Sequence, residues 1–176
     1  MKSFLDGLLP RVLPSEVTVQ YVVHEGKSDL EKSIPRKLRA WNTPDTHFVV
    51  VRDQDSGDCK VIKARLLGLC AGAQRTDVLV RIACHELEAW FLGEMDAVAA
   101  AFHQPSLARH HGERKFKDPD ALGSPSRELA KLVPGYQKVG GARRIAEHFE
   151  PARCTSISFQ VFLSGLLRVV GGGTPQ

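Results

Sequence analysis

Residues 47–59 read His47-Phe48-Val49-Val50-Val51-Arg52-Asp53-Gln54-Asp55-Ser56-Gly57-Asp58-Cys59. An apolar run ends here in an Asp-x-Asp sequence, and a glycine turn follows. Continuous apolar residues without alternation are typical of a strand that is covered on both faces, as in a parallel sheet. Ligand sites in such sheets lie at the carboxyl ends of the strands. The acidic residues after this strand are therefore the first candidates for a functional site.

Asp53 and Asp55 are two residues apart, and on an extended chain such side chains project to the same side. Carboxylates placed in this way can share one hard cation such as Mg²⁺ or Mn²⁺. The alternative is a solvated turn after a core strand, because Asp and Gly are the commonest turn residues. Taken alone, the two aspartates favour the turn.

The composition is that of one globular domain in the cytoplasm. The chain has 176 residues, of which 43% are hydrophobic, and this is enough for a core. No run approaches the ~20 apolar residues of a membrane span, and the first residues make a poor signal peptide. The four cysteines are far apart, as expected of reduced thiols. A net charge of +4 favours anionic partners only mildly.

The order of the expected elements predicts an α/β protein with a mostly parallel sheet flanked by helices. Hydrophobic periodicity predicts helices over residues 4–13, 28–41 and 60–69, strands over 17–23, 48–51 and 77–83, and a helical region over 85–102 that breaks at Gly93. Residues 1–103 then form the α/β core, and 104–125 form a basic loop. Short helices over 126–132, 142–149 and 159–169 make up a C-terminal part, 126–170, that packs on the core. A frayed tail covers 171–176.

The basic loop, called here the basic segment (residues 104–125), is a candidate nucleic-acid contact. Its cations could lie along a phosphate backbone. Its aromatic residues are sparse, so a base-stacking platform is weakly supported. A solvated charged surface explains the pattern equally well. The candidate residues are Arg109, Arg114, Lys115 and Lys117.

A second acidic cluster follows the 77–83 strand, at Glu86 and Glu88. On a helix these two residues lie roughly 200° apart, so we expect that they cannot both face one site. Glu86 could equally be a residue of the first helical turn that the helix dipole favours, and neither glutamate alone indicates a site. Together with Asp53 and Asp55, however, they place carboxylates after two adjacent parallel strands. This is how a cation site is assembled in such a sheet.

The chain resembles a bacterial family called domain of unknown function 4276, which looks like a divergent Toprim fold. The resemblance rests on four blocks that span nearly the whole chain. They are His24-Glu25-Gly26-Lys27-Ser28-Asp29-Leu30, Val51-Arg52-Asp53-Gln54-Asp55-Ser56-Gly57-Asp58-Cys59, Val80-Arg81-Ile82-Ala83-Cys84-His85-Glu86-Leu87-Glu88-Ala89-Trp90 and Ser156-Ile157-Ser158-Phe159.

The resemblance implies metal-assisted phosphodiester chemistry of the Toprim kind. In such domains an Asp-x-Asp holds Mg²⁺, and the matching positions here are Asp53 and Asp55. Glu88 or Glu86 would complete the shell as the catalytic carboxylate. The resemblance also implies a partner ATPase of the AAA class and a use in phage defence.

Members of this family usually open with one more strand that ends in an acidic pair, and the matching strand is missing before Met1. We therefore expect the chain alone to form homo-oligomers or to aggregate. Two hypotheses follow. The first is a Mg²⁺-dependent nuclease-type protein that acts on nucleic acid. The second is a non-catalytic accessory subunit that docks to the ATPase and keeps a vestigial metal site.

Overall fold

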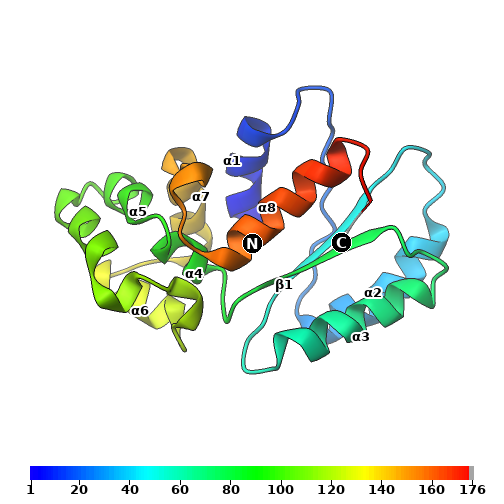
Figure 1. Cartoon of the computed structure of the whole chain (residues 1–176), viewed down its shortest axis with the longest axis horizontal. Coiled ribbons are helices and arrows are strands. Elements are labelled where there is room, and N and C mark those ends of the chain that lie inside the picture. The colour runs from blue at the N-terminus through cyan, green and yellow to red at the C-terminus, as the bar shows by residue number, and fades with distance from the viewer. Residues whose placement is uncertain (175–176) are drawn as a thin grey trace.

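A computed structural model describes residues 1–174 and has a mixed α/β architecture. Two parallel strands, β1 (Phe48–Asp53) and β2 (Val78–Ala83), form a small sheet in the middle of the molecule (Figure 1). They pair in register from Phe48 opposite Val78 to Asp53 opposite Ala83. Helix α3 (Cys59–Ala71) connects them, as a parallel crossover requires. The predicted parallel arrangement of these two strands is confirmed.

Helices cover both faces of the sheet. Helix α1 (Lys2–Val12) and helix α8 (Ile157–Val170) lie on one face, and helix α2 (Lys27–Ala40) and α3 lie on the other (Figure 1). Along β1, Val49 and Val51 pack toward the α1 and α8 side, while Phe48 and Val50 pack toward α2 and α3. Successive strand residues point to opposite faces, so a strand between two helical layers favours apolar residues on both faces. This explains the unbroken apolar run.

The larger core lies beyond the carboxyl end of the sheet, among aromatic side chains. Trp90 is fully buried, and its ring centroid lies 5.1 Å from that of Phe162 and 5.3 Å from that of Phe159. The Trp90 indole N–H donates to Ser158 Oγ at 2.8 Å. Helix α1 joins this core through Phe4, whose ring lies 4.9 Å from Phe91.

The rest of the chain forms short helices around that aromatic core. Helices α4 (Glu88–Leu92) and α5 (Met95–Ala101) are separated at Gly93, as predicted. The C-terminal part contains α6 (Pro125–Leu132), α7 (Lys138–His148) and a short 3-10 turn, η4 (Pro151–Arg153), before α8. No helix within residues 1–174 has the length and apolar character that a membrane span needs. The predicted tail lies in part outside the described residues.

The basic segment is less irregular than predicted. It forms three 3-10 helices, η1 (Pro105–Gly112), η2 (Arg114–Phe116) and η3 (Pro119–Ala121). Leu107 and Phe116 are buried and join the main core. A sequence with faded apolar periodicity is therefore still fixed in place by two buried side chains.

The prediction of a strand over residues 17–23 is wrong. This segment is extended, but it belongs to no sheet. Within residues 1–174, the only backbone hydrogen bond of the segment runs from the Val17 N–H to the Pro14 carbonyl. Val22 and Val23 remain 44% and 67% exposed. Its β-branched residues favour extended backbone, but a strand also requires a partner at hydrogen-bonding distance, and β1 does not reach it.

Candidate carboxylate site

Asp53 is the last residue of β1, and its environment disfavours a negative charge. Oδ1 is buried, and within residues 1–174 it has no hydrogen-bond partner. Burial and the nearby charge of Glu88 raise the pKa of Asp53 to about 6, and Asp55 adds to this effect. The amino group of Met1 and a hydrogen bond from the Leu87 N–H act in the opposite direction. A largely buried carboxylate with one unsatisfied oxygen is a candidate for binding a cation or a proton.

Glu88 approaches Asp53 from the start of α4. Its side chain is buried. Carboxylates are seldom buried unless they are paired with a positive charge or a hydrogen-bond donor. The Tyr136 hydroxyl donates to Glu88 Oε1 at 3.3 Å, and Lys138 Nζ lies 4.0 Å from the same oxygen. Burial and, to a smaller extent, the charge of Glu88 raise the pKa of Tyr136 well above its ordinary value. This hydroxyl therefore keeps its proton. Tyr136 and Lys138 thus partly satisfy the buried charge.

Glu86 lies in the turn that joins β2 to α4. Its carboxylate accepts two hydrogen bonds of 2.8 Å from the Ser126 backbone N–H and hydroxyl. Burial acts to raise the pKa of Glu86, but these bonds and the charge of Lys138 outweigh it and hold the pKa below its ordinary value. Glu86 is therefore an ionised carboxylate tied to the start of α6.

The prediction that Glu86 and Glu88 cannot face one site is wrong. Lys138 Nζ lies 3.5 Å from Glu86 Oε1 and 4.0 Å from Glu88 Oε1, so one ammonium group contacts both. The 200° separation assumed that both residues belong to one helix. Residues 85–87 instead form a turn that begins with a positive φ of 55° at His85, and α4 starts only at Glu88.

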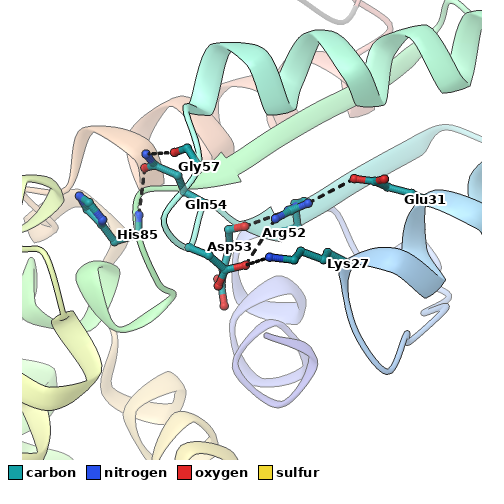
Figure 2. A network of polar contacts seen from close by, with 8 residues as sticks. Lys27, Glu31, Arg52, Asp53, Gln54, Gly57 and His85 are labelled. Carbon is teal, nitrogen blue, oxygen red and sulfur yellow. Dashed lines mark hydrogen bonds and ion pairs between the residues drawn. The ribbon is translucent and has the colours of Figure 1, made fainter.

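Asp55 differs from its predicted geometry. Its φ is +57°, so the chain is not extended there and the same-side argument for residues i and i+2 does not apply. Its carboxylate is exposed and lies 3.9 Å from Lys27 Nζ and 3.4 Å from Arg52 Nη2. Arg52 in turn contacts Glu31 at 3.6 Å, which links the strand end to α2 (Figure 2).

Gln54 holds the two strand ends together. Its side-chain N–H donates to the Gly57 carbonyl at 2.7 Å, and its carbonyl accepts from the His85 N–H at 3.1 Å (Figure 2). The Asp55 N–H also donates to the His85 carbonyl at 2.8 Å. The turns after β1 and β2 are thereby fixed to each other, and this places Asp53 beside Glu88.

Within residues 1–174, no three His, Cys, Asp or Glu side chains gather closely enough to hold a metal ion by themselves. Mg²⁺ needs fewer protein ligands than this, because it keeps several waters and commonly uses one or two carboxylates. Ser126, Tyr136 and Lys138 contact these acidic residues but follow Glu86 by at least 40 positions in the chain. No local sequence pattern therefore links them to the site.

The cations of the basic segment are exposed, but not all of them are available to a ligand. Lys115 pairs with Glu128 of α6, which also binds Lys131 at 3.0 Å. Arg109, Arg114 and Lys117 are exposed.

The free cysteines Cys59 and Cys84 are partly buried, and burial raises the pKa of the Cys84 thiol. A raised pKa leaves less of the Cys84 thiol in its reactive thiolate form.

These features define a class, namely a mixed α/β protein that gathers carboxylates where two parallel strands end. The family model described as "Domain of unknown function (DUF4276)" matches residues 1–167. The chain belongs to this family, as the sequence blocks indicated. Comparisons with the curated proteins and with the solved structures found no match.

Proposed function

We propose that this chain is a Toprim-like, Mg²⁺- or Mn²⁺-dependent protein of the nuclease type that hydrolyses phosphodiesters in nucleic acid. The observation that carries the proposal is the nearness of the partly buried Asp53 to the buried Glu88 at the carboxyl end of the sheet. The charge of Glu88 helps to raise the pKa of Asp53 to about 6, and Asp53 Oδ1 has no partner within residues 1–174. A divalent cation would relieve both costs, because it neutralises the repulsion and occupies the orphaned oxygen.

The donor set suits a hard cation. Asp53 and Glu88 would hold it, and bound waters would complete the shell. A bound Mg²⁺ supplies charge stabilisation and an activated water in phosphodiester cleavage. Among the residues around it, Lys138 contacts both glutamates and offsets part of their negative charge. The exposed cations of the basic segment would hold the phosphate backbone.

The decisive experiment separates binding from cleavage. Mn²⁺ and Mg²⁺ are titrated calorimetrically into the wild type and into Asp53→Asn and Glu88→Gln, at pH 8 where Asp53 is ionised. Asp77→Asn is the matched control, because this exposed aspartate lies beside Arg75 at the opposite, amino end of β2. We expect binding heat in the wild type and in the control, and much weaker heat in the two site variants. Equal heats in all four proteins would contradict the proposed site.

Cleavage is then followed on supercoiled plasmid and on single-stranded oligonucleotides with the same four proteins. We expect metal-dependent nicking in the wild type and in Asp77→Asn, and loss in the site variants. If the wild type binds the cation and no substrate is cut, the site is vestigial. The alternative of an accessory subunit that docks to an AAA-class ATPase is then favoured.

A further inference from the structure

Lys138 is the first residue of α7, and its ammonium group lies between two glutamates of the carboxylate site. Nζ is 3.5 Å from Glu86 Oε1 and 4.0 Å from Glu88 Oε1. The side chain of Lys138 is 66% exposed, whereas those of Glu86 and Glu88 are 24% and 4% exposed. The ammonium group therefore covers the two carboxylates from the solvent side.

The two glutamates are held in place by groups other than this lysine. The Ser126 backbone N–H and hydroxyl each donate to Glu86 at 2.8 Å, and the Tyr136 hydroxyl donates to Glu88 at 3.3 Å. Tyr136 is packed tightly against α7, since a Cβ added at Gly141 would lie 2.3 Å from its ring. The two carboxylates thus form a fixed binding place for a positive charge, and the lysine supplies the charge rather than the geometry.

The carboxylate site carries more negative charge than one divalent cation can neutralise. In their ionised forms Asp53, Glu86 and Glu88 carry three negative charges, which one divalent cation and one ammonium group balance. Asp55 does not change this count, because cations of α2 and β1 pair with it. An uncompensated charge on a buried carboxylate is costly. Sites that cleave phosphodiesters commonly meet such a demand with two metal ions about 3.5–4 Å apart.

We propose that the ammonium group of Lys138 occupies the place of a second cation in the carboxylate site, so that the site takes one divalent cation instead of two. The divalent cation is the one that Asp53 and Glu88 would hold under the proposed function, on which this inference rests. The positive charge beside Glu86 is then permanent and comes from the chain. Without Lys138, the two glutamates become free to hold a second divalent cation.

Calorimetric titration of Mn²⁺ counts the cations that each protein binds. Lys138→Met removes the charge and keeps most of the apolar stem, and Lys138→Gln serves as a second neutral variant. Lys131→Met is the matched control, because Lys131 is 68% exposed and pairs with a glutamate of α6 at 3.0 Å. We expect one Mn²⁺ per chain in the wild type, in Lys131→Met and in Lys138→Arg, which keeps the charge. We expect two in both neutral variants of Lys138.

The position and strength of binding are checked in the same titrations. The first Mn²⁺ should bind at least about tenfold more tightly to Lys138→Met than to the wild type, because a nearby positive charge has been removed. Adding Glu86→Gln to Lys138→Met should return the number of bound ions to one, since the second ion loses a ligand. Two ions in this double variant would overturn the assignment, because the second ion would then lie elsewhere.

The number of bound ions also separates this inference from the proposed function. If the wild type binds no Mn²⁺ and Lys138→Met binds one, the proposed metal-dependent function fails, while Lys138 is upheld as the resident cation. The same number of bound Mn²⁺ ions in the wild type and in both neutral variants, whatever that number is, would overturn the inference. Lys138 would then be only a surface counter-ion of the two glutamates.

Discussion

Replacing Asp53 by Asn should make the protein more stable at neutral pH and should abolish part of its pH dependence. The structure raises the pKa of Asp53 from 3.8 to about 6, first through burial and then through the charge of Glu88. In the unfolded chain both effects disappear. Between pH 4 and 7 the folded state therefore binds more protons than the unfolded state, and the free energy of unfolding falls as the pH rises.

The magnitude follows from the shift in pKa. A difference of about 2 units at 1.36 kcal/mol per unit corresponds to about 3 kcal/mol of stability. This contribution is fully present below pH 3.8 and is lost as the pH rises through 6. Asn cannot ionise, so Asp53→Asn should exceed the wild type by up to about 3 kcal/mol at pH 8 and should match it near pH 4.

Urea denaturation at unit steps from pH 4 to 8, without divalent cations, measures this difference. Asp77→Asn serves as the control and should follow the wild type, because Asp77 is exposed. Addition of Mg²⁺ at 100 times its Kd should then stabilise the wild type by about 2.7 kcal/mol and leave Asp53→Asn unchanged. Parallel stability curves for wild type and Asp53→Asn from pH 4 to 8 would refute the argument, since Asp53 would then titrate as it does in the unfolded chain.

Three further predictions concern the helices and the basic segment. Gly165→Ala should destabilise the fold by about 1–3 kcal/mol, because an added Cβ would lie 2.4 Å from the buried Arg81 guanidinium. Gly68→Ala in the open part of α3 should instead stabilise the fold by about 0.5–1 kcal/mol, and thermal melts compare the two variants. Ser156→Ala should lower the free energy of unfolding in urea by about 2 kcal/mol, because the buried hydroxyl accepts from the Phe159 N–H at the start of α8 and donates to the Asp120 carboxylate. A decrease below about 0.5 kcal/mol would contradict this role. Neutralising the four candidate cations of the basic segment should reduce the slope of log affinity against log salt for nucleic acid by about three phosphate contacts rather than four. The reason is that Lys115 is already paired with Glu128 of α6. If the wild type binds no nucleic acid at low salt, the segment is only a solvated surface.

The sequence by itself determined most of the elements and the two-faced burial of β1. Periodicity placed α1, α2, α3 and α8 to within a few residues, and the Phe-Val-Val-Val run predicted a strand between two helical layers. Gly93 marked the break between α4 and α5. These features depend on residues that are close together in the chain, and propensity and apolar spacing report such local preferences directly.

The tertiary structure decided how distant segments meet. Residues 17–23 have the composition of a strand, but pairing depends on a neighbour that local sequence does not specify. The positive φ values at Asp55 and His85 redirected the candidate carboxylates Asp55 and Glu86, and a single lysine from α7 contacts both Glu86 and Glu88. Such contacts join residues tens of positions apart, and their geometry follows from the packing of whole elements rather than from any pattern within one of them.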